Sequence, residues 1–581
     1  MKKLQRLKTI STLSQRDKRW IHRDIFRTLS NSELFLAAYE NIKGNKGALI
    51  PGSISGSLDG ISSQRLQRLQ TEVYSEKYKF SPVKLILIPL PGKKTRPLGL
   101  PLANDKIVQE VMRMILEAIY EPVFSDLSFG FRAGRGCHTA LAHVEKKFRW
   151  VNWVVEGDIQ HAYPTINHNI LIQILEKRID DPRFIRLIRK FLNCGVFDEY
   201  RKKYSDIGVP QGSLVSPILA NIYYHELDEY VEQLAYKFTT PLEQLTTQRT
   251  AEYKHLEYRI SKLSKKMSDL QQNSSERKQS IKQIKRLRKQ RFETQSLKTS
   301  AIRIEYARYA NDWIIGISGD KNLAIHFKEK IDDFLTNTLK QVMHPVKTKI
   351  TDLRKGNVHF LGYEIFLPAN RPISGYKGKG VRTTRRENPK LRFDVPVALI
   401  EQKYIDRGYL KRTKKGIRPI SRASYTCLED QVIVRHYRSV WFGIKNYYSG
   451  CTNRGRLQYL HYLLHMSCAM TLGHRHRISI SKIFRKHQRD LVIQIPDTDR
   501  TVSFPYERKW RLSSRRWLYM TGITPPTHKY ANRIERSSIR LPCSICDSDE
   551  NPCEMYHVKH VRKQGVRYGG FQHPMALLNR K

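Results

Sequence analysis

The sequence has few acidic residues for its length. Its 581 residues include 54 Asp and Glu against 104 Lys and Arg, which gives a formal net charge of +50. A surface so basic repels itself unless it binds a polyanion. The Lys and Arg residues run through apolar-patterned segments from end to end, together with 30 Tyr and 7 Trp, instead of filling one disordered block. This distribution favours a folded nucleic-acid-binding protein over a basic tail.

Long hydrophobic runs are also missing. No apolar stretch approaches the roughly 18 residues that span a bilayer, and "VKLILIPLPG" is broken by prolines, so we expect no membrane segment. The N-terminal segment "MKKLQRLKTISTLSQRDKRW" is basic but lacks a hydrophobic stretch, so we do not expect secretion. An organellar transit peptide is compatible with this segment.

Cysteines are few and most of them are isolated. The scattered ones are Cys137, Cys194, Cys427, Cys451 and Cys468. Only Cys543, Cys546 and Cys553 cluster. Because this is not the framework of a disulfide-rich secreted domain, we expect a reducing compartment.

The length predicts about two to four domains. A helix is predicted over residues 104–124, because apolar residues recur there on one face. A buried strand, "WVVEGDI", ends in Asp158, and "YARYANDWIIGI" at 306–317 has the pattern of a β-hairpin with the tip Ala310-Asn311-Asp312.

Residues 250–295 differ in character from their surroundings. Apolar residues recur there at heptad spacing, are interrupted by "QQNSS", and then resume; they are Leu256, Ile260, Leu263, Met267, Leu270, Ile281, Ile284 and Leu287. We predict a basic helical hairpin inserted between the "GVPQG" helix and the hairpin at 306–317. A solvated spacer is the alternative, and the charge favours an arm that faces RNA.

After about residue 370 the strand signals become sparse. Two long helices are predicted, "LEDQVIVRHYRSVWFGIKNYYSG" and "RLQYLHYLLHMSCAMTLGHRH", and both carry many basic and aromatic residues. Aromatics interleaved with bases suit stacking and phosphate contact, although about half of them would serve as ordinary core. The candidate RNA-binding residues are Lys445, Tyr447, Tyr448, Arg454, Arg456, Arg475 and Arg477.

Two strand-end carboxylates suggest chemistry. Asp158 and Asp312 lie in the same predicted α/β block, and paired carboxylates on neighbouring strands are what two-metal phosphoryl transfer requires. Structural aspartates at strand ends would give the same pattern, so the neighbouring motifs are needed to distinguish a metal-binding pair from two structural residues.

The order of those motifs along the chain is informative. They are "KKTRPLGLP", "SFGFRAGRGCHTAL", "VVEGDIQHAYPTINH", "GVPQGSLVSPILANIYYHELD", "YARYAND" and "HFLGYEI". The series resembles the reverse-transcriptase domain of group II intron-encoded proteins, the maturase family, in its organellar or bacterial branch. It is colinear over most of residues 20–370. The later segment "IKNYYSGCTNRGRLQYLHYLLHMSCAMTLGHRHRISISKIFRKH" resembles the thumb and maturase domain X of that family.

The resemblance implies a right-hand fold of class α/β followed by α. Fingers and palm would be followed by a helical thumb with domain X and by a short, truncated Cys/His segment. The implied divisions are residues 1–80 as an N-terminal helical region and the start of the fingers, 81–370 as fingers and palm with the insertion at about 235–300, 371–500 as thumb and domain X, and 501–581 as a basic, DNA-binding-like region with a partial HNH-like remnant.

The resemblance also implies site residues. Palm residues at the positions of Asp158, Asn311 and Asp312 would hold two Mg²⁺ ions. The nucleotide pocket would include Lys94, Arg96, Tyr163, Pro210, Gln211 and Gly212. The primer end would be supported by Phe360, Leu361 and Gly362.

Several positions depart from the family pattern. The family has Tyr-Ala-Asp-Asp at the hairpin tip, and Asn311 replaces the first Asp, which is expected to bridge both metals. An amide is a poor ligand for Mg²⁺, which favours anionic oxygen. "AYPTINH" replaces the usual "FFDNIDH" and thereby loses acids at Pro164 and Asn167, and Leu90 stands where lysine is usual. We therefore predict that efficient reverse transcription is lost, with Mg²⁺ as cofactor only of an active polymerase.

The C-terminal cysteines resemble the start of a zinc-associated HNH endonuclease domain. Cys543, Cys546 and His557 match its first half, but Tyr556 replaces a family His and no second Cys-x-x-Cys follows before "ALLNRK". One Cys-x-x-Cys is only half a zinc site. A complete site would have to recruit Cys553, His557 or His560, so we expect neither bound zinc nor DNA cleavage.

Three functions fit these observations to different degrees. The first is a splicing factor that binds a group II intron RNA and stabilises its catalytic fold. The second is an active RNA-directed DNA polymerase that supports retrohoming, and the third is a general RNA-binding protein or a decayed reading frame. The first fits best. Group II intron RNA is the expected partner, DNA and a second copy of the chain are further candidates, and an organelle (chloroplast or mitochondrion) is the expected location, with the bacterial cytoplasm as alternative.

Overall fold

A computed structural model describes most of the chain. The described ranges are 4–45, 57–89, 95–198, 205–241, 247–269, 274–294, 301–368, 390–496, 498–507 and 526–535, with short strands and single residues between and after them. Lys94, Leu90, Cys543, Cys546 and His557 lie outside the described residues.

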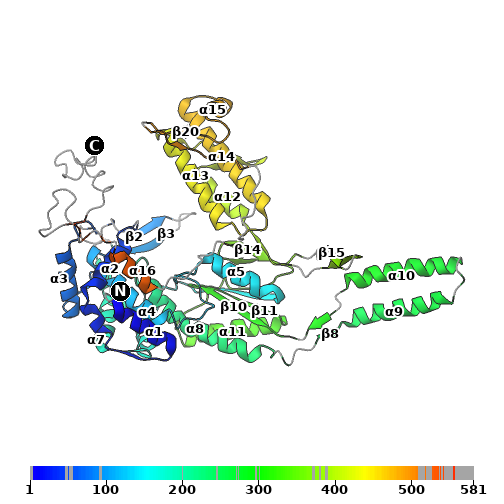
Figure 1. Ribbon diagram of the computed structural model, residues 1–581, viewed down its shortest axis with the longest axis horizontal. Helices are drawn as coiled ribbons and strands as arrows, with labels where there is room; N and C mark the ends of the chain where they lie inside the picture. The colour runs from blue at the N-terminus through cyan, green and yellow to red at the C-terminus, as the bar shows by residue number, and fades with distance from the viewer. Residues whose placement is uncertain are drawn as a thin grey trace.

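The N-terminal part is a helical layer next to a small sheet (Figure 1). Its helices are α1 (Gln5–Arg16), α2 (Ser32–Ile42), α3 (Ser63–Tyr74), α4 (Ala103–Tyr120), α6 (His168–Glu176) and α7 (Pro182–Leu192). The sheet has the order β3-β2-β6-β7, with β2 (Val83–Pro89), β3 (Thr95–Leu100), β6 (Val196–Asp198) and β7 (Arg201–Lys203). The helix predicted over 104–124 is confirmed as α4, which is buried along nearly its whole length. A two-stranded pair joins β1 (His22–Arg23) to β5 (Ile179–Asp180).

The central sheet carries the candidate carboxylates. Its order is β10-β11-β4-β12 and all its pairs are antiparallel, with β4 (Trp153–Asp158), β10 (Ile304–Tyr309), β11 (Asp312–Ile317) and β12 (Lys349–Asp352). The predicted hairpin at 306–317 is confirmed as β10 and β11. Helices α5 (Cys137–Lys147), α8 (Ser216–Phe238) and α11 (Lys321–Asn337) contact this sheet.

Both faces of the central sheet are buried, which explains the unbroken apolar runs of its strands. Neighbouring residues of a strand point to opposite faces. Val155 and Ile315 belong to a core shared with the N-terminal helices, whereas Val154 and Ile314 belong to a core shared with the thumb. The sheet therefore links the two hydrophobic cores of the molecule.

The predicted basic insertion is an antiparallel helical hairpin, α9 (Ala251–Ser268) and α10 (Ser275–Glu293), which we call the arm. Its seam is Leu256, Ile260, Leu263, Met267, Ile284 and Leu287, and these residues form a small core of their own. Two short strands, β8 (Thr247–Arg249) and β9 (Leu297–Thr299), pair at its base. The arm projects away from the body of the protein (Figure 1). The apolar spacing thus predicted these six seam residues, whereas Ile281 is exposed and Leu270 lies outside the described residues.

The thumb is mainly helical and stands beside the palm (Figure 1). Its helices are α12 (Val397–Asp406), α13 (Asp430–Tyr447), α14 (Arg454–His476) and α15 (Ile480–His487). Hairpins accompany them, namely β18 (Leu410–Thr413) with β19 (Gly416–Pro419) and β20 (Ile493–Gln494) with β21 (Thr501–Val502). A sheet of β13 (Val358–Phe360), β14 (Tyr363–Phe366) and β17 (Arg392–Asp394) joins thumb to palm, and β15 (Ile373–Gly378) pairs with β16 (Val381–Arg386). The expectation that strands become sparse after residue 370 thus missed the short strands from β15 to β21.

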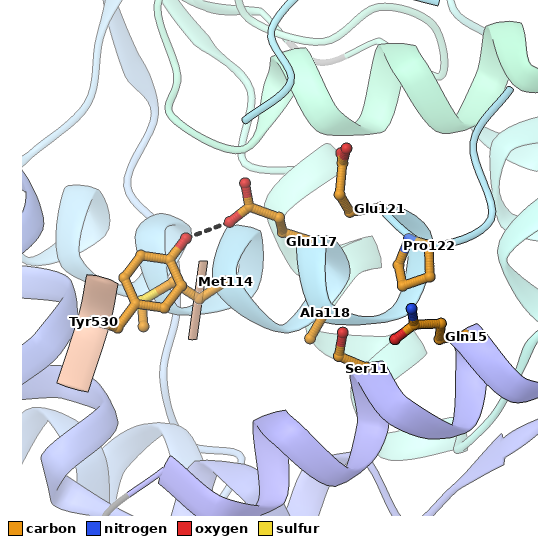
Figure 2. Close-up of a pocket in the computed structure, with 8 residues that line it drawn as sticks. All are labelled: Ser11, Gln15, Met114, Glu117, Ala118, Glu121, Pro122 and Tyr530. Atoms are coloured by element: carbon orange, nitrogen blue, oxygen red, sulfur yellow. Dashed lines mark hydrogen bonds between the residues drawn. The ribbon is translucent and has the colours of Figure 1, made fainter. Parts of the chain in front are cut away.

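A C-terminal helix returns to the N-terminal layer. Helix α16 (Pro526–Glu535) packs on α2 and α4 (Figure 1), with Tyr530 and Ile534 buried. A cavity of about 220 Å³ lies between α1, α4 and α16. Figure 2 shows the side chains that line it, among them Tyr530, whose hydroxyl donates to the Glu117 carboxylate. The main chain of Met555 also pairs with Ile61. Described parts of the predicted tail therefore belong to the folded body.

Membrane insertion was not expected from the sequence. Among the described residues, no helix combines the length and the apolar character that crossing a membrane requires.

Candidate functional site

The two candidate carboxylates lie side by side on the central sheet. In the antiparallel ladder of β4 and β11, Asp312 pairs directly with Asp158. Asp158 is only 5% exposed and Asp312 is half-buried. Two buried apolar strands thus deliver two acidic side chains to one edge of the sheet, while their role as metal ligands stays a prediction.

The hairpin tip is a tight two-residue turn. Tyr309 pairs with Asp312, which leaves Ala310 and Asn311 in the turn, and Ala310 has a φ of +56°. A positive φ at the first turn position is the geometry that matches the twist of a hairpin, although glycine usually fills it. The loop before α5 packs against this turn, because a Cβ on Gly130 would lie 2.4 Å from the Ala310 nitrogen.

Both oxygens of the Asp158 carboxylate have a donor within the protein. The Asn311 amide donates to Oδ1 at 2.5 Å. The Lys347 ammonium donates to Oδ2 at 2.5 Å, although the lysine side chain itself is 61% exposed. The Asn311 amide and the Lys347 ammonium therefore each occupy one oxygen of the carboxylate that a metal ion would need.

The neighbouring Asp312 has a pKa above the usual value of an aspartate. Burial and the adjacent Asp158 carboxylate raise its pKa to about 7, and Lys347 opposes this shift only in part. Two carboxyl groups that share a small site do not both ionise readily. At neutral pH the pair therefore carries less negative charge than two free aspartates.

These residues do not fit a two-Mg²⁺ centre. Two metal ions bring four positive charges, whereas the site offers two carboxylates, one of them hard to ionise, next to the Lys347 cation. Each Mg²⁺ ion is usually held in near-octahedral geometry by one or two carboxylates together with water and substrate phosphates, so two ions here would have to share one readily ionised carboxylate that is already paired with Lys347. Within the described part of the chain, no group of three or more His, Cys, Asp or Glu side chains is placed to hold a metal ion.

Residues predicted to line a nucleotide pocket lie where β3 meets the "GVPQG" loop. Arg96 Nε donates to Gln211 Oε1 at 3.1 Å, and the Gly99 amide donates to the Gln211 carbonyl at 2.5 Å. Gly212 has a φ of +111°, and a Cβ there would lie 2.4 Å from the Gly99 oxygen, so only glycine fits.

Tyr163 and Pro210 adjoin this loop. The Tyr163 carbonyl accepts from the Val209 amide at 2.9 Å, immediately before Pro210, and burial raises the pKa of the Tyr163 phenol to about 12. The structure thus brings Arg96, Tyr163 and the loop together, and their role in nucleotide binding remains a prediction.

The predicted primer-support residues form a tight turn between β13 and β14. Phe360 ends β13, and Leu361 and Gly362 have φ values of +47° and +71°. The Tyr447 hydroxyl donates to the Leu361 carbonyl at 2.7 Å. This turn therefore connects the palm to thumb helix α13.

The predicted RNA-binding residues of the thumb fall into two groups. Tyr447 and Tyr448 pack around Tyr363 at the junction with the palm, Lys445 is paired with Glu507 at 2.5 Å, and Arg475 with Asp430 at 2.9 Å. Arg454 is half-buried, whereas Arg456 and Arg477 are exposed. RNA contact by these residues stays a prediction, and the exposed pair is the most accessible for it.

A buried ion pair that sequence reasoning missed supports the hairpin. Arg308 and Asp228 are both fully buried, and the guanidinium contacts both carboxylate oxygens at 2.7 and 2.6 Å. Arg308 also donates to the Ala310 carbonyl and to Ser128 Oγ, each at 2.9 Å, and Tyr306 donates to Asp228. The available signal was an arginine at an inward position of a strand whose other inward residues are apolar or aromatic.

Comparisons with known proteins agree with this architecture. A reverse transcriptase (RNA-dependent DNA polymerase) family model matches residues 88–240, and a type II intron maturase model matches residues 388–513. The group II intron-encoded protein LtrA of Lactococcus lactis subsp. cremoris is 31% identical over 98% of this chain and 95% of its own. An uncharacterised 91 kDa protein in the cob intron of Schizosaccharomyces pombe is 32% identical over 99% of this chain and 70% of its own.

A more distant relative extends the range of sources. An uncharacterised mitochondrial protein of Marchantia polymorpha is 25% identical over 67% of this chain and 56% of its own. A reverse transcriptase domain followed by a maturase domain defines the class of protein. The chain belongs to the family of group II intron-encoded proteins.

Proposed function

We propose that the chain is a group II intron maturase, which binds the intron RNA and promotes its splicing, and that its polymerase activity is weak or absent. The RNA performs the chemistry, while the protein supplies charge, shape and aromatic contacts. Within this proposal, residues 81–370 act as fingers and palm, 371–500 as thumb and domain X, and 501–581 as a basic, DNA-binding-like region with a partial HNH-like remnant.

One observation carries the second half of the proposal. The palm keeps its sheet and its hairpin, yet Asn311 and Lys347 both donate to Asp158. A working two-metal polymerase needs that carboxylate for its metals. A family member that keeps the palm sheet and hairpin but pairs Asp158 with an amide and a lysine is best suited to binding RNA, which needs the fold and not the metal site.

The first half is supported by family membership and by charge. The net charge of +50 suits a large polyanion, and intron RNA is the partner that the family name supplies. DNA and a second copy of the chain remain further candidate partners, and the binding tests compare them with the intron RNA. Because the relatives include a bacterial and a mitochondrial protein, we propose an organelle as the location, with the bacterial cytoplasm as alternative.

The test is splicing at low Mg²⁺ with and without Asp158. We expect the purified protein to accelerate splicing of its cognate intron RNA by at least about 10-fold, and the Asp158→Asn variant to do so equally, because the acid has only a local structural role. Reverse transcription on a primed template is measured in parallel. If splicing does not respond to the protein, the proposal fails; if cDNA synthesis is robust and disappears in Asp158→Asn, the polymerase alternative is correct.

The arm gives a second test of RNA binding. Helix α9 carries five basic and two acidic residues and α10 eight and two, a formal charge of +9 for the two helices. Exposed cations surround the buried Ile284 and Leu287, so their replacement leaves the seam intact. Reversing Lys282, Lys285 and Lys289 to Glu is expected to weaken intron binding and to lower the slope of log K against log salt by about 2 or more.

Filter binding over a salt series measures this effect, and circular dichroism checks that the arm remains helical. Unchanged affinity and slope would make the arm a spacer.

A further inference from the structure

A tryptophan from the C-terminal region is buried at the junction of palm and thumb. Trp517 is only 2% exposed, although it comes after β21, the last strand of the thumb. Its indole Nε1 donates to the Glu145 carboxylate at 2.6 Å. Glu145 belongs to α5, which packs on the palm strand β10. A side chain from beyond the thumb is therefore hydrogen-bonded to the palm.

The ring contacts of the indole come from both sides of the junction. Its centroid lies 5.6 Å from that of Tyr363 on β14 and 5.3 Å from that of Phe393 on β17, both in edge-to-face geometry. It also lies 5.8 Å from the ring of His138 on α5. The Nε2 atom of His138 is in turn 2.7 Å from the carbonyl oxygen of Tyr447, at the end of thumb helix α13. Aromatic pairs in this geometry stabilise a contact beyond the area that they bury.

The thumb makes room for the indole at a glycine. Gly450 follows α13 and is buried, and a Cβ at this position would overlap the six-membered ring of Trp517. The φ of Gly450 is not positive, so its backbone is open to other residues. The fit therefore depends on the missing side chain and not on an unusual backbone angle.

The chain on either side of Trp517 is attached to different parts of the molecule. Before it, Phe504 and Tyr506 pack on His461 of α14, with ring centroids 5.3 and 5.9 Å apart. After it, α16 packs on α2 and α4 of the N-terminal layer, where Tyr530 is buried. Helices α14 and α16 lie far apart in the molecule (Figure 1). The C-terminal region thus connects the thumb with the N-terminal layer and contacts the palm through Trp517.

Most buried tryptophans are ordinary core residues, and burial alone gives Trp517 no special role. Its contacts distinguish it from that case. The hydrogen bond goes to the palm, the space for the ring is left by the thumb at Gly450, and the indole itself comes from neither part. Removing it therefore takes away contacts between palm and thumb more than contacts within either of them.

We infer that Trp517 is a positioning residue that fixes the thumb at one angle to the palm and so fixes the spacing of their RNA-binding surfaces. The inference rests on the proposed function, since it takes the intron RNA as the ligand. The arm is inserted into the palm, and Arg456 and Arg477 are exposed on the thumb. An RNA that contacts both has to bridge the junction. A thumb that swings freely would have to be ordered on binding, and this ordering lowers the affinity.

The test replaces the indole in the full-length chain. We expect Trp517→Ala to broaden the distribution of distances between palm and thumb and to lower the affinity for the cognate intron RNA by about 10-fold. The slope of log K against log salt should stay native, because no cation is removed. Single-molecule energy transfer between dyes on azidophenylalanine, incorporated at the exposed positions Lys330 of α11 and Ser439 of α13, measures the distances. Filter binding over a salt series measures affinity and slope.

Trp441→Ala is the matched control. Trp441 is also buried, but its ring packs on His461 within the thumb, at 4.6 Å between centroids. Both substitutions should lower the melting temperature of the chain. Only Trp517→Ala should broaden the palm–thumb distances and weaken RNA binding, so the comparison separates positioning from a general loss of packing.

Gly450→Ala tests the same contact without changing the tryptophan. The added methyl group should displace the intact indole, broaden the distances and weaken binding, with the salt slope again native. It also keeps the inference testable where Trp517→Ala does not fold, which thermal melting shows. In the Trp517→Ala background, Gly450→Ala should have little further effect, because the ring that it displaces is already absent.

The outcomes separate this inference from the proposed function. If the native chain binds the cognate intron no better than an unrelated RNA or a duplex DNA of equal length, the proposed function fails, while the distance measurement still tests the position of the thumb. If native binding is specific but Trp517→Ala and Gly450→Ala keep the native distances or the native affinity, only the inference is overturned. Equally broad distances in Trp441→Ala, or effects of Gly450→Ala and Trp517→Ala that simply add, overturn it as well.

Discussion

Replacing Arg308 with alanine is expected to lower the stability of the palm by about 3–5 kcal/mol and to abolish splicing activity. The substitution leaves Asp228 as a fully buried carboxylate without its guanidinium partner, which is the costly way to break a buried ion pair. It also removes the donors to Ala310 and Ser128 that hold the hairpin and the loop before α5. Hydrogen exchange of the β10 and β11 amides measures the local loss.

Two controls distinguish this buried pair from an ordinary one. Lys177→Ala breaks a largely exposed pair with Glu226 on the same helix α8 and should cost less than about 1 kcal/mol. Arg308→Met combined with Asp228→Leu removes both charges and should recover about half of the lost protection, since no buried charge is left alone. If Arg308→Ala exchanges as slowly as the native chain, the pair does not support the hairpin.

Local patterns in the sequence predicted the elements that depend on neighbours in the chain. The heptad of 256–267 anticipated the seam of the arm because α9 and α10 pack on each other and on little else. The alternation at 306–317 anticipated β10 and β11 because a two-residue turn joins strands that are adjacent in sequence. Asp158 and Asp312 were expected together because Asp158 ends an apolar strand and Asp312 lies at the hairpin tip of the same α/β block.

Contacts between distant residues escaped the same reasoning. Lys347 reaches Asp158 across 189 positions, and Tyr530 reaches Glu117 across 413. A lysine in "HPVKTK" looks like any surface cation, and "HKYANRIE" looks like a short amphipathic helix with no stated partner. Only the packing of the chain shows that Lys347 pairs with Asp158 in the palm and that Tyr530 binds Glu117 in the N-terminal layer.

This difference bears directly on the polymerase question. The change at Asn311 was visible in the sequence as the loss of one acid, but the effect of Lys347 was not. Together they turn a site that should attract cations into one that already contains the Lys347 cation and a carboxyl, Asp312, whose pKa is raised to about 7. The electrostatic deficit is therefore larger than a single Asp-to-Asn change predicts.

The Asn311→Asp substitution is accordingly expected to make the stability of the palm dependent on Mg²⁺. The new carboxylate replaces a donor to Asp158 with a third negative group, so without metal the repulsion should destabilise the hairpin by about 1–3 kcal/mol. With three acids the site attracts a hard divalent cation, and millimolar Mg²⁺ should restore the native melting temperature through binding to the folded state. Thermal melting over a Mg²⁺ series measures this rescue, with primer extension as the second readout.

Asn311→Ala is the matched control, because it removes the amide without adding charge. It should lose some stability, but Mg²⁺ should not restore it. Adding Lys347→Ala to Asn311→Asp removes the competing ammonium and should lower the Mg²⁺ concentration at which rescue occurs by about 10-fold or more, since a cation at 2.5 Å from Asp158 opposes metal binding directly. If Asn311→Asp is as stable as the native chain without metal and gains nothing from Mg²⁺, the three side chains do not share one site, and Asn311 and Lys347 do not set the electrostatics of the palm.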